Sequence, residues 1–481
     1  MSEVMSDVLV LIGPGLAADE ALLGEIAERE FVSLGVRGVI TRVRDPDDVR
    51  ARTRRRHPGW GGGQGERHNS AGHAVVILPG PGELRTLMAE PLGPVTWLDI
   101  WRADGVEVAE DATHLHGRGL AGLRWAVRHA VHRIRHPHVR IPYGPHRDQW
   151  GHLYLPSAGD AGPARAVPEG GAPSGAAPKD GPASAAAEHG ALSGVGAGST
   201  RAVPEGDVPS GDPSPAGDVG SAIPVAEGDA ASGEHGVPLL PRRRAAAPGV
   251  RAGEVAGGPS PVVVLVHGGY WRSVWAADLM EALCADLTAR GFAVWNLEYR
   301  RPDLHGWDAT TADVAAGMEA LTRLDAPLDL GRLAVAGHSA GGQLALRAAA
   351  DGAGVALAVS LAGVLDLVEG DRRWVGTGAV AAALGVTTWD DLPERERSTA
   401  ERVYGGASPL VRVPIKVRQL IVQGSGDDLD LVDFGRRYAR AAANAGDEVT
   451  YLEMVGDHFA VIDPRTPIWE ATAHAIAEAL H

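Results

Sequence analysis

A segment of about a hundred residues near the middle of the chain most constrains what this sequence can fold into. Within residues 161–260, 66 residues are Ala, Gly, Pro or Ser, and none is Phe, Trp or Tyr. Such a composition offers too little apolar surface to offset the entropy lost when a backbone becomes ordered. We therefore predict a disordered segment over residues 157–258, with folded parts of the chain before and after it.

The charge balance excludes several classes of partner. The chain has 45 basic and 61 acidic residues, a formal net charge of −16, and no segment has the positive excess that binding a phosphate backbone requires. The single cysteine, Cys284, excludes an intrachain disulfide and a cysteine-based metal cluster. No signal peptide or membrane span is evident. We expect a cytoplasmic protein with no nucleic-acid or membrane partner.

The part before the insertion alternates buried-type strands with helices, a pattern typical of a parallel sheet covered on both faces. Continuous apolar runs predict strands, and apolar residues on one face predict helices. The predicted strands are 8–12, 74–78 and 95–101, and the predicted helices are 19–29 and 119–134. Residues 50–70, rich in Arg and Gly, are predicted to form a polar loop. His114 and His116 are interpreted as an exposed pair on a loop, with a rebuilt site as the alternative.

The part after the insertion has a stronger α/β alternation and predicts an open, mostly parallel, doubly wound sheet. The predicted strands are 262–266, 292–299, 333–337, 356–361, 419–423 and 448–455, and the predicted helices are 275–289, 309–323, 340–350, 431–445 and 468–480. Residues 364–411 are too many for an ordinary connection between a strand and a helix. We expect this stretch to form a cap over the sheet edge.

Residues 337–341 (GHSAG) follow a predicted strand and precede a predicted helix. A G-x-S-x-G sequence in this context is typical of a nucleophile elbow, in which a sharp turn exposes the serine hydroxyl at the carboxyl edge of the sheet. Ser339 is therefore the candidate nucleophile.

A second glycine-rich turn, residues 267–271 (HGGYW), follows the strand predicted at 262–266. Its N–H groups could hold a developing oxyanion, together with the N–H of the residue after the nucleophile. The expected donors are Gly269, Tyr270 and Ala340. His267, Gly268 and Trp271 are candidates for the substrate pocket.

A serine nucleophile needs a base and an orienting carboxylate, which follow the serine in chain order in hydrolases of this type. Asp427 follows the strand predicted at 419–423, with Asp428 and Asp430 as competitors for the role of acid. His458 is the histidine between these aspartates and the C-terminal helix, and is the candidate base.

With these motifs in place, residues 259–481 resemble the α/β-hydrolase superfamily. The combination of HGGYW, EYRR (298–301), GHSAGG (337–342) and GDHFAVID (456–463) is similar to kynurenine formamidases and related esterases. The resemblance extends to residues 143–156, which match the first strand region of these hydrolases. It implies that the disordered segment is inserted into the hydrolase domain and does not link two domains.

The N-terminal part, assigned to residues 1–142, resembles type II 3-dehydroquinate dehydratase, which has a flavodoxin-like fold. The resemblance rests on VLVLIGPGL (8–16), VVILPG (75–80), PVTWLDIW (94–101) and HGRGLAGLRWAV (116–127). The family's catalytic residues do not carry over: Ile12 and Leu78 replace its asparagines, Asp99 replaces its histidine, and no tyrosine precedes Tyr143. This domain is therefore predicted to keep the fold without the chemistry.

Together these features predict a serine hydrolase that cleaves a small ester or an N-formyl or aryl amide, as in kynurenine formamidase. No metal or organic cofactor is implied. Two alternatives stay open: a general carboxylesterase, and an interaction protein that forms homo-oligomers through the N-terminal domain and carries a subsidiary hydrolase.

Overall fold

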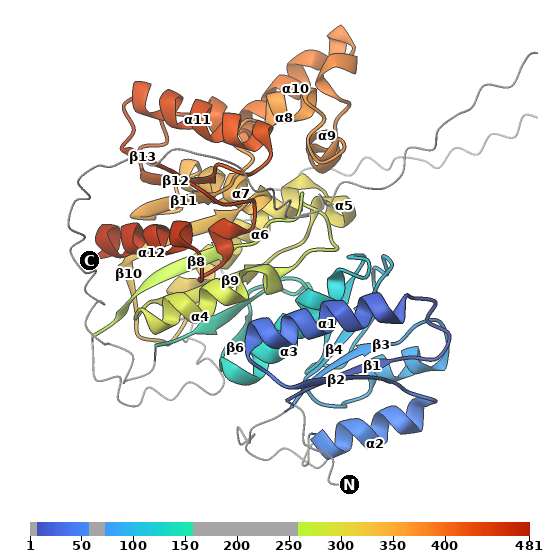
Figure 1. Ribbon diagram of the computed structural model, residues 1–481. Coiled ribbons are helices and arrows are strands. Elements are labelled where there is room, and N and C mark those ends of the chain that lie inside the picture. Colours follow the sequence, from blue (N-terminus) through green and yellow to red (C-terminus); the bar gives the residue numbers. More distant parts are fainter. Residues whose placement is uncertain (1–6, 57–72, 157–257) are drawn as a thin grey trace, which may run out of the picture. The chain divides into compact units, whose positions relative to one another are not determined.

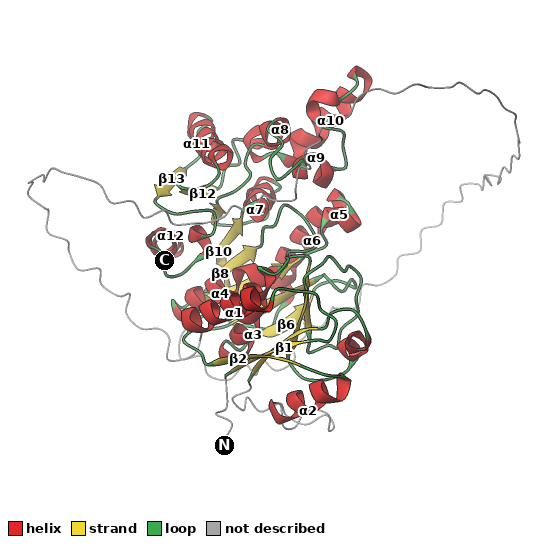
Figure 2. Ribbon diagram, turned by 45° about the vertical axis from the view of Figure 1, so that its right-hand side comes forward, coloured by secondary structure: helices red, strands yellow, loops and turns green. Residues whose placement is uncertain are grey.

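The computed structural model describes residues 7–56, 73–156 and 258–481, and all of them belong to one compact unit of the chain. Their strands form two separate sheets (Figures 1 and 2). The insertion predicted over residues 157–258 lies, apart from its last residue, outside the described residues.

The smaller sheet has five parallel strands in the order β2-β1-β3-β4-β5. The strands are β1 (Val8–Ile12), β2 (Gly38–Arg42), β3 (Ala74–Leu78), β4 (Val95–Asp99) and β5 (Thr113–His116), and the helices are α1 (Glu20–Leu34), α2 (Pro46–Arg56), the 3₁₀ helix η1 (Glu83–Ala89) and α3 (Gly122–Arg135). This strand order is that of flavodoxin-like folds. The prediction of a flavodoxin-like parallel sheet is therefore confirmed.

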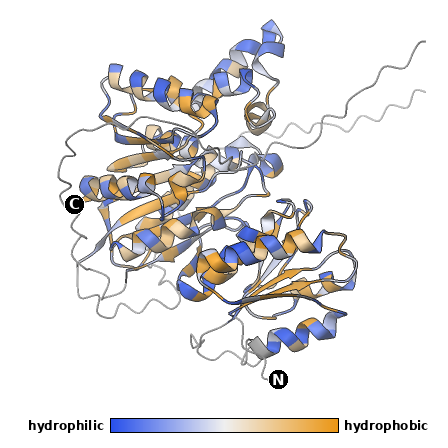
Figure 3. Ribbon diagram, in the orientation of Figure 1, coloured by the Kyte–Doolittle hydropathy of each residue, from blue (hydrophilic) through white to orange (hydrophobic). Residues whose placement is uncertain are grey.

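The apolar strands explain why this sheet is covered on both faces. In β1 all five residues are buried, and alternate side chains contribute to two different cores. Val8 and Val10 pack with residues of α1 and α3, whereas Leu9 and Leu11 pack with residues of α2 and η1. Figure 3 shows these strands in the hydrophobic colour.

Two predictions for this domain were wrong. Residues 50–56 belong to helix α2, not to a loop; the rest of the predicted loop, 57–72, lies outside the described residues. The helix buries only Val49 and Thr53 among residues 46–54, so its apolar face is too narrow to give a clear periodic signal. His114 and His116 lie on strand β5 with their side chains largely buried, not on an exposed loop.

The larger sheet has eight strands in the order β13-β12-β11-β10-β8-β9-β7-β6. They are β6 (Val139–Pro142), β7 (Trp150–Tyr154), β8 (Ser260–Val266), β9 (Ala293–Glu298), β10 (Leu328–His338), β11 (Leu357–Leu361), β12 (Arg418–Gly424) and β13 (Val449–Met454). Strand β7 pairs antiparallel with β6 and β9, and the other pairs are parallel. The predicted open, mostly parallel sheet is confirmed.

Strands β6 and β7 precede the insertion, and β8 follows it, yet all three belong to the same sheet. The expected boundary between residues 142 and 143 needs a correction, because β6 begins at Val139 and already pairs with β7. The larger sheet therefore starts before residue 143.

Helices cover both faces of the larger sheet (Figure 2). They are η2 (Ala277–Met280), α4 (Glu281–Ala289), α5 (Pro302–His305), α6 (Trp307–Ala320), η3 (Leu321–Arg323), α7 (Ala340–Ala350), α8 (Leu367–Arg372), α9 (Ala379–Leu384), η4 (Trp389–Asp391), α10 (Glu394–Ala407), η5 (Pro409–Arg412), α11 (Leu429–Asn444), η6 (Ala460–Ile462) and α12 (Pro467–Leu480). One core contains residues of α6, α7 and α11, and the other contains residues of α4 and α12. Helices α8 to α10 lie within residues 364–411, the stretch expected to form a cap. None of the helices in the described ranges is long and apolar enough to cross a membrane.

Candidate active site

Ser339 occupies a sharp turn between strand β10 and helix α7. Its backbone has φ 54° and ψ −119°, a strained conformation for a residue with a side chain. The two flanking positions must be glycine because there is no room for a Cβ atom at either of them. A Cβ at position 337 would lie 1.9 Å from the carbonyl oxygen of Gly341, and a Cβ at position 341 would lie 2.2 Å from that of Val266. The first glycine of the G-x-S-x-G pattern therefore allows the turn to close on itself, and the second allows it to pack against β8.

The loop after β8 runs beside this turn. A Cβ on Gly268 would lie 2.9 Å from the Cβ of Ser339, so the glycine lets the two segments touch. Gly269, Tyr270 and Trp271 follow with φ values of 110°, 51° and 56°. Non-glycine residues in this region are strained and persist only where their surroundings hold them. Within the described residues, the N–H groups of Gly269, Tyr270 and Ala340 have no hydrogen-bond acceptor.

Two of the predicted pocket residues, His267 and Trp271, have buried side chains. His267 is fully buried, and its ring nitrogens lie 2.8 Å from the carbonyl oxygen of Gly268 and 3.2 Å from Glu298. Burial lowers the pKa of His267 to about 3, so the ring is neutral. The buried indole of Trp271 donates a hydrogen bond to Gln343 at 3.1 Å. The polar atoms of both side chains therefore have partners inside the protein.

His458 and Asp427 form a hydrogen-bonded pair. His458 lies on the loop after β13, and its Nδ1 is 2.9 Å from an oxygen of Asp427, which lies on the loop after β12. The amide of Gln423 donates to the same oxygen at 2.9 Å, and the side chain of Asp427 is almost fully buried. These bonds fix the carboxylate, and the carboxylate orients the imidazole.

The two competing aspartates have other partners. Asp428 is the N-cap of helix α11, and its carboxylate accepts a hydrogen bond from the N–H of Asp430 at 2.9 Å. The carboxylate of Asp430 pairs with Arg373 at 2.9 Å. Of the three aspartates considered, Asp427 is the one that contacts His458.

His338 connects the serine turn to the histidine loop. Its Nε2 donates a hydrogen bond to the backbone carbonyl of His458 at 3.0 Å, and the two rings lie 4.7 Å apart. Burial lowers the pKa of His338 to about 3, so it is a neutral donor. Across the described ranges, no hydrogen bond joins the hydroxyl of Ser339 to His458. The two loops are adjacent because the residue next to Ser339 holds the backbone of His458.

Three positions that the dehydratase resemblance singled out are Ile12, Leu78 and Asp99. Ile12 and Leu78 are buried apolar residues. Both oxygens of Asp99 accept bonds from Arg85, at 2.7 and 2.8 Å, and one also contacts His114 at 2.9 Å. Burial alone would raise the pKa of Asp99, but the bonds from His114 and Arg85 outweigh it and lower the pKa to about 2. This carboxylate is an internal ion-pair partner.

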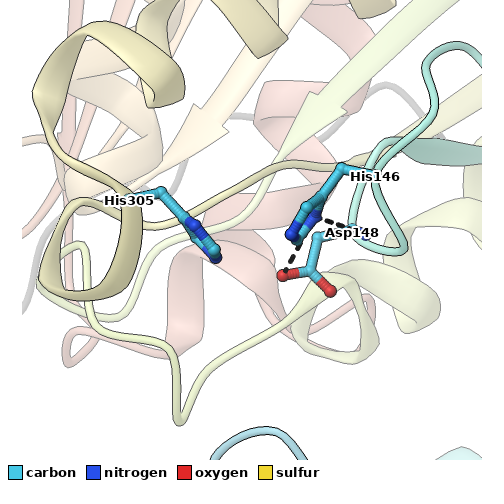
Figure 4. A group of neighbouring side chains, drawn as sticks. All are labelled: His146, Asp148 and His305. Carbon is cyan, nitrogen blue, oxygen red and sulfur yellow. Dashed lines mark hydrogen bonds and ion pairs between the residues drawn. The ribbon is translucent and has the colours of Figure 1, made fainter.

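One group of side chains outside the serine region has metal-ligand chemistry. His146, Asp148 and His305 place candidate ligand atoms within 4.8 Å of one another (Figure 4). However, the N–H of Asp148 donates to Nδ1 of His146 at 3.2 Å, and its carboxylate lies 3.5 Å from Arg301 and 3.6 Å from Arg147. Two guanidinium groups beside the only carboxylate oppose a cation. We assign no metal to this group.

A cavity of about 430 Å³ lies between helices α6 and α7. Its apolar lining includes Val314, Met318 and Leu344. It contains none of the site residues predicted from the sequence, so it is separate from the candidate active site.

Residues 263–462 match the family model for the alpha/beta hydrolase fold. Over 251 residues the chain is 31% identical to Esterase LipC of Mycobacterium tuberculosis (strain ATCC 25618 / H37Rv), a match that covers 46% of this chain and 57% of that protein. The chain thus spans less than two thirds of this relative. Among solved structures it is similar to a bacterial heroin esterase (24% identity, TM-score 0.38, covering 47% of this chain and 76% of the other). It is also similar to carboxyl esterase 2 from the fungus Tuber melanosporum (18% identity, TM-score 0.38, covering 46% and 80%).

Proposed function

We propose that the protein is a serine hydrolase that cleaves small carboxylic esters. The observation that carries the proposal is the 2.9 Å contact between Asp427 and His458, beside the strained turn that holds Ser339. A buried carboxylate that orients a histidine next to a strained serine turn is the arrangement needed to activate a serine hydroxyl. The match of residues 263–462 to the alpha/beta hydrolase fold supports the same chemistry.

In this proposal, Oγ of Ser339 attacks the ester carbonyl carbon while Nε2 of His458 takes the hydroxyl proton. The carbonyl oxygen becomes an oxyanion, held by the N–H groups of Gly269, Tyr270 and Ala340. His458 then gives the proton to the departing alcohol, and a water molecule repeats the sequence to release the acid. Catalytic hydrogen bonds are often long in free enzymes, so Ser339 and His458 would come together when substrate binds.

The proposal also concerns which acyl and leaving groups the substrate carries. The HGGYW and GHSAGG sequences resemble those of kynurenine formamidases, which favours N-formyl aryl amides as a second substrate class. The esterase names of the similar proteins favour esters, and we place esters first. A panel of formyl, acetyl and butyryl aryl esters and amides, together with N-formylkynurenine, separates the two classes by their kcat/KM values.

The decisive test of the mechanism is Ser339→Ala, with Ser398→Ala on the exposed face of α10 as the matched control. We expect Ser339→Ala to lose at least about 10³-fold in kcat and to lose labelling by a fluorophosphonate, while Ser398→Ala keeps both. Turnover by Ser339→Ala within about tenfold of the wild type would contradict the nucleophile assignment.

The remaining expectations for the whole protein stay predictions. They are a cytoplasmic location, no nucleic-acid partner, and homo-oligomers that form through the N-terminal domain. The rival function, an interaction protein with a subsidiary hydrolase, is distinguished by the absence of labelling by the fluorophosphonate.

A further inference from the structure

The N-terminal domain contacts the hydrolase segment that directly follows the HGGYW loop. Arg118, between β5 and α3, forms two hydrogen bonds to the carboxylate of Asp278, at 2.6 and 2.8 Å. The side chains of both residues are almost completely buried. The same guanidinium donates to the carbonyl oxygen of Val274 at 2.7 Å and lies over the ring of Trp275, 4.5 Å from its centre. The side chain of Arg118 therefore contacts three residues of the segment 274–278, namely Val274, Trp275 and Asp278.

Other residues of the N-terminal domain contact the same segment. Arg102 donates to the hydroxyl of Ser273 at 3.0 Å, and that hydroxyl donates to Asp104 at 2.9 Å. On helix α3, Trp125 packs edge-on against Trp275, with ring centres 6.2 Å apart. These contacts leave the segment little freedom to shift relative to the N-terminal domain.

Trp275 transmits this restraint to the proposed oxyanion loop. Gly269 lies so close to Trp275 that a Cβ on the glycine would be 2.3 Å from the Cβ of the tryptophan. The N–H of Trp275 donates to the carbonyl of Arg272, whose own N–H donates to the carbonyl of Gly269, at 3.1 and 3.0 Å. The direction of the Gly269 and Tyr270 N–H groups thus depends on where residues 272–275 lie.

Helix α3 also reaches the loop of the proposed base. The ring of Trp125 is 5.8 Å from that of Phe459, the neighbour of His458 in sequence. Both catalytic loops of the hydrolase are therefore in contact with residues near a single helix of the N-terminal domain.

We propose that the N-terminal domain serves as a positioning element of the hydrolase, and that Arg118 is the residue that holds the oxyanion loop in its strained, active form. This inference rests on the proposed function. Arg118 touches no reacting atom, so its effect appears in stabilisation of the transition state: kcat falls when it is changed, while KM is nearly constant.

The experiment compares Arg118→Lys and Arg118→Ala with the wild type and with Arg50→Ala. Removing one partner of a buried ion pair is strongly destabilising, so Arg118→Lys, which keeps the charge, is the variant expected to fold. Arg50 is the matched control, because it also forms a two-bond pair, with Glu90 at 2.6 and 2.9 Å, but within the N-terminal domain. Urea unfolding establishes that each variant is folded before kcat and KM are measured on an aryl ester.

We expect kcat to fall about tenfold in Arg118→Lys and further in Arg118→Ala. The fall in kcat should not exceed about 10³-fold, which is the loss that follows removal of one oxyanion-hole donor. KM should stay within about threefold of the wild type, and Arg50→Ala should keep the wild-type kcat.

A folded Arg118→Lys with the kcat of Arg50→Ala would overturn the positioning role. So would a rise in KM at constant kcat, since that result indicates a role in substrate binding. The proposed function is judged separately, on the same ester: a wild type without turnover that depends on Ser339 would overturn both proposals.

Discussion

His138 makes the fold sensitive to acid in a way that can be calculated. It lies between α3 and β6, its Nδ1 donates to the carbonyl oxygen of His136 at 2.9 Å, and its ring packs 4.2 Å from that of His152. Burial lowers the pKa of His138 to about 4, against about 6.5 for an unfolded histidine. Between these two values the unfolded chain binds more protons than the folded one. The stability that depends on His138 being neutral is therefore fully present above about pH 6.5 and is lost as the pH falls towards 4.

The size of this loss follows from the two pKa values. Going from about pH 7.5 to about pH 5 should lower the free energy of unfolding by about 2 kcal/mol through His138 alone. Burial also lowers the pKa values of His132 and His152, which act in the same direction. The free energy of unfolding of the wild type should consequently fall by more, between these pH values, than His138 alone accounts for.

The assay is urea unfolding, followed by tryptophan fluorescence, at both pH values. His138→Asn keeps a donor for the carbonyl of His136 but cannot titrate, so its loss of stability between the two pH values should be about 2 kcal/mol smaller than that of the wild type. His474→Asn, at an exposed position on α12, should behave as the wild type. Equal losses in His138→Asn and the wild type would refute the reasoning.

Three further predictions concern the site and the N-terminal domain. Asp427→Asn should lower kcat about 10⁴-fold, because it removes the carboxylate that orients the base, whereas Asp428→Asn should change kcat little; the reverse order in steady-state assays would contradict the assignment. Gly341→Ala should unfold or inactivate the protein, since its Cβ would lie 2.2 Å from a strand carbonyl, whereas Gly24→Ala, with no atom within 4 Å, should raise the urea midpoint slightly. The purified protein should not dehydrate 3-dehydroquinate, and turnover that survives Ser339→Ala would show otherwise.

The elements around the site were predictable because their signals are local. A continuous apolar run followed by a glycine-rich turn predicted the strands that became β1, β3, β8 and β10. The order β2-β1-β3-β4-β5 of the smaller sheet is that of other flavodoxin-like sheets. Short-range sequence patterns were sufficient here because these strands are buried on both faces.

Two of the missed strands lie at the edges of the smaller sheet. Strands β2 (Gly38–Arg42) and β5 (Thr113–His116) each have one neighbour, and only part of their surface is buried. Their sequences mix polar and apolar residues, so no continuous run or strict alternation marks them. Edge strands of this kind are recognised from their partners, which the sequence does not identify.

The choice among the three aspartates needed the fold, although one local signal was present. Asp428 directly precedes the amphipathic stretch 429–444, which is where a helix N-cap is expected. That role occupies its carboxylate and leaves Asp427 as the acid nearest the end of β12. The buried supporting roles of His267 and Trp271 had no such signal, because their partners Glu298 and Gln343 are distant in sequence.

The polar groups of the N-terminal domain form internal pairs and contacts with the hydrolase. At one position that the dehydratase resemblance singles out, the carboxylate of Asp99 is bonded to Arg85 and His114. Arg118 is one of the charged groups of this domain that contact the hydrolase, and it is paired with Asp278. A buried ion pair has a large desolvation cost and contributes little net stability, but it allows only one geometry of its two partners. A contact of that kind suits a domain whose role is to hold a loop in place, and the kcat of the Arg118 variants is the quantity that should reveal it.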